Sequence, residues 1–478
     1  MIDSQTGIQL DSGKSASGML HGVLRQAVEA YPQALNSVQL PASAAAFRQA
    51  YIELLPEFET ARIASKQRSS IAGALARALE DHLIYRSSDH SLSLAEYMNQ
   101  TARALPLEHS PPVTPTGWQP AVPYRGRTWN STSALGEVLL QDGVLTPSAS
   151  AALAWLESHA MTAGRISLAD RKIVVIGANA EMAPTRYLLA TGADVLWLDL
   201  APPPPALVSS TTPGGRLSWI RGNADLLNQP GEILATIIDF SDGEPVDLCL
   251  FAYAPGQARE LRLTGAMNGI VNALPPALIR SVTMLLSPTT ATPLGREDLE
   301  AIDARRSNRP AWEALLDSLN LLGRGGGCAR QNDVGATRTV VGIQGASYQA
   351  AQYLGKLMMA ECWATQGQTR VADPVPLRVS ANTAAITRTR SMSHPVFDAA
   401  FGGAGALQVE TFTPEQSRCI NGLLAIHDWL NPDMPQPASI RVHGGIHSLP
   451  YPLNTALRTA ALIGFLKSPG LLLKLVRH

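Results

Sequence analysis

The sequence predicts an α/β fold, a doubly wound and mostly parallel sheet with helical additions at both ends of the chain. Residues 172–200 read as strand, turn, helix and strand, and further apolar runs alternate with helical segments as far as residue 381. The parts of the chain before residue 165 and after residue 396 have helical spacing. With 478 residues, of which 45% are hydrophobic and 16% charged, the chain is long enough to bury a sizeable core.

Residues 1–165 are predicted to form a helical region that packs on the sheet. Segments 44–55, 57–83 and 92–105 carry apolar residues at three- and four-residue spacing. A proline-rich segment near 108–124 is predicted to be a linker or an extended arm. We expect a plain scaffold role for this region, with substrate shaping or oligomerisation as the alternative.

The sheet is predicted to begin with the apolar, β-branched run at 173–176, which suits a strand buried on both faces. A glycine turn at Gly177 leads into a helical segment, and the second strand closes on Asp199, 22 positions after Gly177. The glycine lets a backbone approach a pyrophosphate, a helix start offers free N–H groups, and a carboxylate after the second strand binds ribose hydroxyls at an offset of about 20. This pattern predicts a nucleotide lying over the turn.

The turn departs from the usual pattern of two or three glycines. After Gly177 it carries Asn179, Glu181 and Ala183. Asn179 tolerates a left-handed backbone and Ala183 is small enough for close packing, but Glu181 would put a negative charge near a phosphate unless it points away. A βαβ unit that has the shape and no longer binds nucleotide is the alternative.

Four further strands are predicted near 216–220, 246–251, 281–286 and 377–381. Asp225 follows the first of these and could accept a hydrogen bond from an adenine amino group. The fourth strand of the sheet ends in small residues, among them Ala252, where a backbone could pass close to a cofactor. Segment 295–327 is an inserted helical segment that ends in glycines, and it is predicted to be a lid over the site or a passive surface insertion.

In this order the pieces resemble a divergent member of the short-chain dehydrogenase/reductase superfamily, which has an NAD(P)-binding Rossmann fold. The match covers residues 172–392: the glycine turn, Asp199, the turn at 223–225, the small-residue turn at 251–256, Ser287 after strand five, a helix bearing tyrosine and lysine, and the loop 379–389. The resemblance implies an NAD(P)-dependent oxidoreductase that transfers hydride to or from a carbonyl or enone of a largely apolar small molecule. It also implies that Thr387 and Thr389 meet the nicotinamide side of the cofactor.

The chemistry of that family uses a tyrosine acid/base, a lysine that tunes the tyrosine and holds the ribose, and a serine that binds the carbonyl oxygen. The resemblance implies Ser287 as the serine, Tyr348 or Tyr353 as the acid, and Lys356 as the lysine. Gln352 stands four positions after Tyr348, where the family usually has its lysine. Tyr353 and Lys356 are neighbours on a helix face, whereas Tyr348 and Lys356 are about 12 Å apart along the axis. Either tyrosine could instead be a buried structural residue.

Asp199 would repel a 2′-phosphate, so NAD is preferred over NADP. The predicted domains are therefore the helical region 1–165, the Rossmann-like domain 166–395 with its insertion 295–327, and a helical C-terminal region 396–478. A second function is kept open, a non-catalytic Rossmann protein that senses nucleotides or binds protein partners. Glu181 and Gln352 are the residues that favour it.

Composition and motifs exclude several other classes. A formal charge of −1 and the lack of a basic stripe argue against nucleic acid. Four dispersed cysteines, and a His443–His447 pair whose intervening Gly444 and Gly445 argue against a helix, predict no metal site. Neither a Walker loop nor a Gly-x-Ser-x-Gly elbow occurs.

The ends of the chain carry weaker signals. The start has no apolar leader, and no run reaches the roughly 18 apolar residues of a membrane span, so a cytoplasmic location is expected. Segment 453–478 combines apolar clusters with basic residues. It is predicted to make a dimer contact or a peripheral membrane contact, and the protein is expected to be a homo-oligomer.

Overall fold

An eight-stranded sheet runs through the middle of the chain, in the order β18-β17-β13-β12-β9-β10-β11-β4. The computed structural model describes residues 6–11, 15–88, 90–111, 114–208, 215–254, 256, 258–369, 377–433 and 438–471. Every neighbouring pair in the sheet is parallel except β11 and β4, which are antiparallel. This confirms the predicted α/β class with a mostly parallel sheet. The strands are β4 (Leu107–His109), β9 (Lys172–Ile176), β10 (Asp194–Leu198), β11 (Leu217–Ile220), β12 (Val246–Leu250), β13 (Ile279–Leu286), β17 (Arg378–Thr383) and β18 (Ala438–Ser439).

Both faces of the sheet are buried, because alternate residues of its central strand enter different cores. In β9, Val174 and Ile176 belong to one core, and Ile173 and Val175 belong to the other. Side chains of successive strand residues point to opposite faces, so a strand covered on both sides reads as a continuous apolar run. That is the pattern of residues 173–176 in the sequence.

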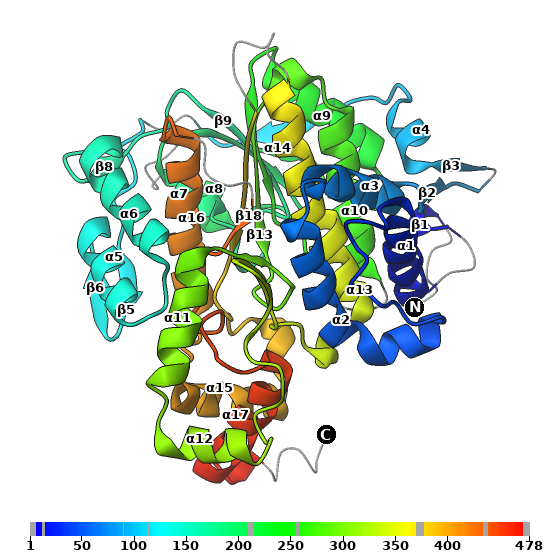
Figure 1. Cartoon of the computed structure of the whole chain (residues 1–478). Helices are drawn as coiled ribbons and strands as arrows, with labels where there is room; N and C mark the ends of the chain where they lie inside the picture. The colour runs from blue at the N-terminus through cyan, green and yellow to red at the C-terminus, as the bar shows by residue number, and fades with distance from the viewer. Residues whose placement is uncertain are drawn as a thin grey trace.

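The first core lies under the N-terminal helices and a long helix that precedes β17 (Figure 1). The long helix runs from 345 to 369 and changes from α to π and back. A short sheet of β1 (Gly7–Leu10), β2 (Leu83–Arg86) and β3 (Ser91–Ser93) joins this side. The helices on this face are α1 (Ala16–Ala30), α2 (Ala44–Ala64), α3 (Arg68–Glu80), α4 (Leu94–Met98), α9 (Pro230–Ser241), α10 (Arg259–Ala273), α13 (Gly345–Gln349), the π-helix η4 (Ala350–Met358) and α14 (Met359–Thr369).

The second core lies under helices on the opposite face, drawn at the left of Figure 1. These helices are α5 (Thr132–Gln141), α6 (Pro147–Trp155), the π-helix η1 (Leu156–Ala160), α7 (Thr185–Ala190) and α16 (Pro414–Leu430). The short helix α8 (Pro205–Val208) and two hairpins, β5 (Val122–Tyr124)–β6 (Arg127–Trp129) and β7 (Met161–Thr162)–β8 (Arg165–Ile166), also contribute residues to this core. α7 begins at Thr185, several residues later than the helix expected directly after the glycine turn.

One expectation for the N-terminal region needs correction, and the structure decides between the two alternatives for part of another. The helix expected over 92–105 covers only Leu94–Met98, because the chain then leaves the helix and becomes β4. The proline-rich segment near 108–124 starts as that edge strand, which pairs with β11 and so extends the sheet. The extended-arm alternative therefore describes residues 107–109 better than a free linker does.

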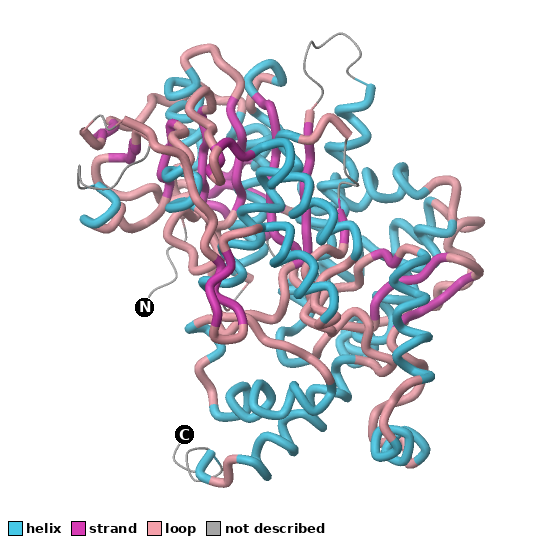
Figure 2. The backbone as a smooth tube through the Cα atoms, turned by 90° about the vertical axis from the view of Figure 1, so that its left-hand side faces the viewer, coloured by secondary structure: helices cyan, strands magenta, loops and turns pink. Residues whose placement is uncertain are grey.

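The insertion after β13 and the C-terminal helices form a layer at the lower end of the molecule (Figures 1 and 2). The insertion contains β14 (Pro293–Leu294), α11 (Arg296–Ser307), α12 (Ala311–Ser318), β15 (Cys328–Gln331) and β16 (Val334–Thr337), and the C-terminal pair is α15 (Pro395–Ala404) and α17 (Leu453–Lys467). α15 and α17 cross at backbone contact: a Cβ on Gly403 would lie 1.8 Å from Ala460 O, and one on Gly464 would lie 1.7 Å from Ala399 O. Only glycine fits at this crossing.

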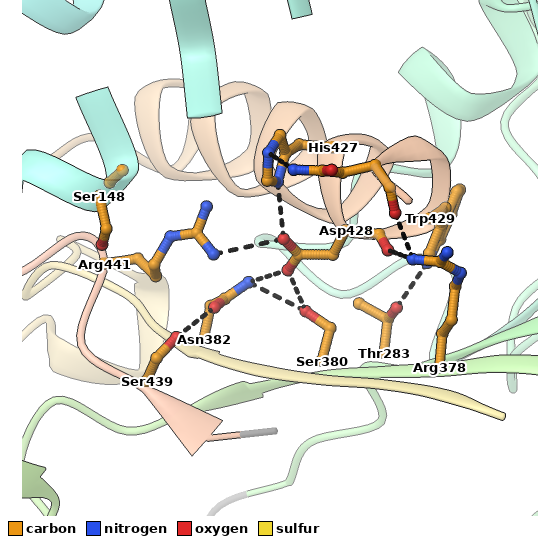
Figure 3. Close-up of polar contacts among 12 residues, drawn as sticks. Ser148, Thr283, Arg378, Ser380, Asn382, His427, Asp428, Trp429, Ser439 and Arg441 are labelled. Atoms are coloured by element: carbon orange, nitrogen blue, oxygen red, sulfur yellow. Dashed lines mark hydrogen bonds and ion pairs between the residues drawn. The ribbon is translucent and has the colours of Figure 1, made fainter. Parts of the chain in front are cut away.

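A buried polar cluster ties the C-terminal segment to the sheet (Figure 3). Asp428 on α16 accepts from Ser380 Oγ (2.5 Å) and Asn382 Nδ2 (2.8 Å), both on β17, and from Arg441 Nη1 (3.2 Å). His427 Nδ1 lies 2.9 Å from the other side of the same carboxylate. Because one carboxylate joins α16, β17 and the chain after β18, it fixes their positions relative to each other.

Candidate functional site

A cavity of about 810 Å³ opens at the carboxyl ends of the central strands. Its walls come from the segments that follow four strands. They are residues 179–182 after β9, residues 251, 253 and 254 after β12, residues 287–289 after β13, and residues 384–387 and 389 after β17. From β9, the chain adds β10 and β11 toward one edge of the sheet. It then returns to the other side of β9, where it adds β12 and β13 toward the opposite edge, so the strand order reverses between β9 and β12. In open α/β sheets this is the place where ligands bind.

A polar cluster occupies the inner wall of the cavity. Tyr348 and Ser287 both line this wall, and the Ser287 hydroxyl lies 2.7 Å from Thr289 Oγ1. Lys356 Nζ lies 3.5 Å from Glu260 Oε1, and both side chains are buried. The structure therefore brings together the predicted Ser287, Tyr348 and Lys356 in one cavity.

Gln352 connects the two halves of this cluster. Its amide nitrogen donates to Glu260 Oε1 (3.1 Å), and its carbonyl oxygen accepts from the Ser287 backbone N–H (3.0 Å). A second oxygen of Glu260 accepts from the Ala254 backbone N–H (3.2 Å). The cluster thus joins α10, the π-helix η4 and the segments after β12 and β13.

The π-helix explains why Tyr348 and Lys356 share the cavity. Eight residues of α-helix would make about 2.2 turns and would place the two side chains on different faces. Residues 350–358 are wound as a π-helix, whose wider turn holds more residues. The eight-residue separation therefore comes closer to two whole turns, and both residues line the cavity.

The structure corrects the prediction that Tyr353 could be the catalytic acid. Tyr353 does not line the cavity: its side chain is 0% exposed, and its hydroxyl donates to Glu59 Oε2 (2.6 Å) on α2. Its ring packs edge-on against Phe58. Tyr353 follows Tyr348 by five residues and turns toward the N-terminal helices, so the expected pairing of Tyr353 with Lys356 in the site does not occur.

Charge and burial set the protonation of the cluster. Burial raises the pKa of Tyr348 well above its usual range, and the charge of Glu260 raises it further, whereas the Ser287 side chain lowers it. Burial also raises the pKa of Glu260, and Lys356 opposes that shift. Tyr348 is therefore a protonated phenol, a hydrogen-bond and proton donor, at neutral pH.

The turn after β9 is tightly packed. Gly177 has φ +80°, and a Cβ there would lie 2.3 Å from the backbone nitrogen of Ala252, so Gly177 is needed for the approach of β9 to the segment after β12. Ala183 and Ala252 are buried and do not line the cavity, whereas Asn179 and Glu181 do. The prediction that a small residue at 183 permits close packing agrees with its burial.

Glu181 lies on the cavity wall and is held by basic residues. Its carboxylate accepts from the Arg390 backbone N–H (3.0 Å) and lies 3.6 Å from Arg390 Nε. Arg418 on α16 donates to the Glu181 carbonyl oxygen through two nitrogens (2.9 and 2.8 Å). The negative charge therefore faces the cavity, with a guanidinium beside it.

Asp199 and Asp225 do not line the cavity. Asp199, half-buried at the end of β10, accepts from the Asn179 backbone N–H (2.9 Å) and so closes the turn. Asp225 accepts from the backbone N–H groups of Leu227 and Asn228 and from the Asn228 amide (2.6 Å). Its carboxylate stabilises its own turn, which leaves the predicted contact with adenine without support from the geometry.

Thr387 and Thr389 both line the cavity, next to the segment after β17. The Thr387 hydroxyl is buried and lies 2.6 Å from Ser417 Oγ on α16. The Thr389 hydroxyl lies 2.9 Å from Ser391 Oγ and is less buried. Thr389 is therefore the more accessible of the two predicted hydroxyls.

The outer half of the cavity is apolar and comes from the C-terminal helices. Its lining side chains include Phe397, Phe401, Leu407, Leu453, Leu457 and Ala460. Residues 295–327 do not line it; Arg305 of α11 instead donates to the carbonyl oxygens of Leu407 and Gly445. This geometry favours the passive alternative for the insertion over the lid.

Sequence reasoning missed Glu260 and the apolar helices. The signal for Glu260 was an acidic residue in the first turn of the helix after β12. The signal for the apolar wall was the pair Phe397 and Phe401, which lie four residues apart on a helix. Neither pattern is specific enough to identify a site.

His443 and His447 are both buried, in the chain after β18. Burial lowers the pKa of His443 to about 4 and that of His447 to about 3, so both rings are neutral, and their centroids lie 6.0 Å apart. Within the part of the chain that the structure describes, no three His, Cys, Asp or Glu side chains are grouped to hold a metal ion.

The C-terminal segment forms α17, which exposes Leu462 and Leu466 on its outer side. The rest of the segment for which a dimer or membrane contact was predicted, residues 472–478, lies outside the described residues. Across the described ranges no helix has both the length and the apolar character that crossing a membrane needs.

Comparison with known proteins gives only a distant likeness. No protein-family model and no curated protein matches the chain. The chain is similar to a short-chain dehydrogenase/reductase, described as glucose/ribitol dehydrogenase, from Brucella melitensis, at 17% identity and TM-score 0.35 over 58% of this chain and 96% of that one. It is also similar to ligand-free aldohexose dehydrogenase of Thermoplasma acidophilum (14%, TM-score 0.33, 58% and 94% covered) and to a short-chain type dehydrogenase/reductase of Mycobacterium ulcerans (12%, TM-score 0.37, 61% and 99% covered). Likeness this weak assigns no activity, so the function has to be argued from the cavity.

Proposed function

We propose that the chain is an oxidoreductase of the short-chain dehydrogenase/reductase type, which moves a hydride between a nicotinamide dinucleotide and the carbonyl or enone of a largely apolar small molecule. One observation carries the proposal: Ser287, Tyr348 and Lys356 converge in one cavity at the point where the strand order reverses. A doubly wound sheet places a dinucleotide at that point. The apolar wall from α15 and α17 supplies the place for the substrate.

The residues present fit the reacting half of such a cofactor better than its diphosphate half. Thr389 and Ser287 offer hydroxyls on the cavity wall. Asp199 follows β10 and lies outside the cavity, where a carboxylate beside the adenosine ribose would favour NAD over NADP. Glu181 carries a negative charge that would repel the diphosphate near its expected position. Arg390 beside it is positively charged and also lines the cavity. We therefore assign the cavity to the nicotinamide end and the substrate.

Different residues of the chain have different roles at the carbonyl oxygen of the substrate. A bound nicotinamide dinucleotide would supply or accept the hydride. The Ser287 hydroxyl holds the substrate oxygen, and Tyr348 gives its phenolic proton to that oxygen during reduction. Lys356 and Gln352 fix the helix that carries Tyr348 against Glu260 and Ser287. The apolar outer half excludes water and orients the rest of the substrate.

Glu181 favours the second function, a non-catalytic nucleotide-sensing or partner-binding Rossmann protein. Nicotinamide fluorescence and thermal-shift titrations with NADH and NADPH separate the two. Saturable binding, together with turnover on a panel of apolar carbonyl compounds, supports the enzyme. If neither nucleotide changes the fluorescence or the melting temperature, the result supports the non-catalytic scaffold.

A further inference from the structure

Large apolar side chains are exposed mainly at the lower end of the molecule (Figure 1). Of the eleven large hydrophobic residues that the described part of the chain exposes, six lie on α12, just after it, or on α17. Leu316 of α12 packs in the same core as the buried residues of α17, so the two helices form one body at this end. The six residues, which we call the apolar patch, are Trp312, Leu315, Leu319, Leu321, Leu462 and Leu466.

The patch residues project from one side of each helix. Trp312, Leu315 and the C-cap residue Leu319 are three and four positions apart on α12, and Leu462 and Leu466 are four apart on α17. The five leucines of the patch are 54–73% exposed, and no patch residue lines the cavity. A protein partner usually receives its apolar anchors in matching pockets, whereas a fluid lipid phase accepts projecting leucines without them.

The charge around the patch is positive. Arg324 follows α12, and Arg458 and Lys467 lie on α17; all three are exposed, and none is in an ion pair with another described residue. Residues 311–327 contain two acids: Glu313, which is buried, and Asp317, which pairs with an arginine at 3.0 Å. Residues 453–471 contain no acid. The cations beside the patch are therefore available to an anionic partner.

These charges favour an anionic surface over a second copy of the chain. A two-fold interface would place the patch of one copy against the patch of the other, and Arg324, Arg458 and Lys467 would then face the same cations. The neighbouring helix α15 contains a single acid, the exposed Asp398, which does not balance three cations. An anionic bilayer supplies an apolar interior for the leucines and negative headgroups for the cations.

We propose that the lower end of the molecule docks on an anionic phospholipid bilayer, with the apolar patch inserted and Arg324, Arg458 and Lys467 on the headgroups. Docking goes beyond the proposed function and does not depend on it.

α17 connects this surface with the cavity. Leu453, Ala456, Leu457 and Ala460 line the apolar half of the cavity, and at about 3.6 residues per turn they lie on the side of α17 opposite Leu462 and Leu466. A docked α17 would therefore lie between the bilayer and the cavity. We expect the apolar substrate to come from the bilayer, and this consequence alone rests on the proposed function.

The test is flotation of the full chain with unilamellar vesicles, made of phosphatidylcholine with phosphatidylserine or of phosphatidylcholine alone. It needs no cofactor and no substrate. Leu462→Ser with Leu466→Ser removes the α17 part of the patch, and Leu315→Ser with Leu319→Ser removes the α12 part. Leu200→Ser is the control, because Leu200 is 63% exposed and follows β10, outside the patch.

A second pair of variants tests the charges. Arg458→Gln with Lys467→Gln removes two cations beside the patch, and Arg25→Gln with Arg103→Gln removes two exposed cations from the N-terminal region. The first pair should weaken binding to the mixed vesicles and reduce its dependence on salt, because screening acts on exposed charges. The second pair should bind as wild type does.

Wild type should float with the mixed vesicles, and each leucine pair should lower the partition coefficient by at least about tenfold, whereas Leu200→Ser should leave it unchanged. Absence of flotation with the mixed vesicles, equal flotation with both vesicle types, or binding that survives both leucine pairs overturns the proposal. Sedimentation velocity adds a further outcome: a wild-type dimer that the leucine pairs convert to a monomer assigns the patch to a second copy and also overturns it. Flotation without NADH or NADPH binding removes the proposed function and leaves the docking surface.

Discussion

Exchanging each tyrosine of the long helix for phenylalanine separates the catalytic from the structural hydroxyl. Tyr348 lines the cavity beside Ser287, whereas Tyr353 is buried against Glu59 on the far side of the helix. Each substitution removes one oxygen and leaves the ring. The two variants are therefore matched in chemistry and differ in where the hydroxyl points.

Tyr348→Phe should lower kcat by about 10²–10⁴, the usual contribution of a positioned general acid. Its cost in stability should be small, because the hydroxyl borders the cavity and water can replace it. NADH binding should be retained, since the phenol is assigned to the substrate oxygen.

Tyr353→Phe should behave in the opposite way. The Glu59 carboxylate loses a 2.6 Å donor but keeps two bonds of 2.8 Å each from Arg62. A buried acceptor left short of a partner costs about 1–3 kcal/mol, so the denaturant midpoint should fall while kcat stays within a few-fold of wild type.

The assay is steady-state reduction of a panel of apolar ketones and enones, with urea denaturation of both variants in parallel. Loss of turnover in Tyr353→Phe with full turnover in Tyr348→Phe would refute the assignment. Unchanged turnover in both would remove tyrosine acid catalysis altogether.

The remaining predictions concern the turn, the charges and the buried cluster. Gly177→Ala should destabilise the protein by at least about 1–3 kcal/mol in urea denaturation, because φ is +80° and a Cβ would meet Ala252 N at 2.3 Å; an unchanged midpoint contradicts the packing described. Glu181→Gln should tighten NADH binding several-fold in a fluorescence titration, because it removes a negative charge from the expected diphosphate site; weaker binding would place the diphosphate elsewhere. Asp428→Asn should cost about 3–5 kcal/mol at pH 7, because Arg441 keeps a buried charge without its partner. Burial would raise the pKa of Asp428, but His427, Arg441, Ser380 and Asn382 bring it below the usual value. Its contribution is therefore present above about pH 3.9 and is lost as the pH falls through the lower folded value, and the variant should lack this loss of stability below about pH 3.9.

The sheet was predictable because its signal is local. Continuous apolar runs such as 173–176 mark strands that are buried on both faces, and the alternation with helices predicts parallel pairing. The sequence also located the glycine of the first turn, whose role appears in the contact of Gly177 with the segment after β12. These features depend on residues close together in the chain.

The choice between Tyr348 and Tyr353 depends on the type of helix, which the spacing of residues in the sequence does not reveal. A regular α-helix favours Tyr353 as the neighbour of Lys356, and that expectation was wrong because residues 350–358 are wound as a π-helix. This helix also packs closely on α10: a Cβ on Gly355 would lie 2.5 Å from Thr264 Cγ2. Such contacts join segments about ninety residues apart.

Asp225 and Glu260 show the same limit for charged residues. From the sequence alone, a carboxylate that follows a strand can be expected to bind a ligand or to stabilise its own turn. In the structure, Asp225 accepts from the backbone of residues 227 and 228. Glu260 reads as an ordinary acidic residue at a helix start, yet folding places it against Lys356. A local turn thus decided the role of Asp225, and a contact between distant segments decided the position of Glu260.

The most direct test of the account is a titration of the wild-type protein with NADH and NADPH, followed by nicotinamide fluorescence, and then addition of an apolar carbonyl compound that should bind in the outer half of the cavity. The account predicts saturable binding that is tighter for NADH, and a fluorescence change when the carbonyl compound is added. No fluorescence change with either nucleotide would contradict the assignment of this cavity to a nicotinamide cofactor.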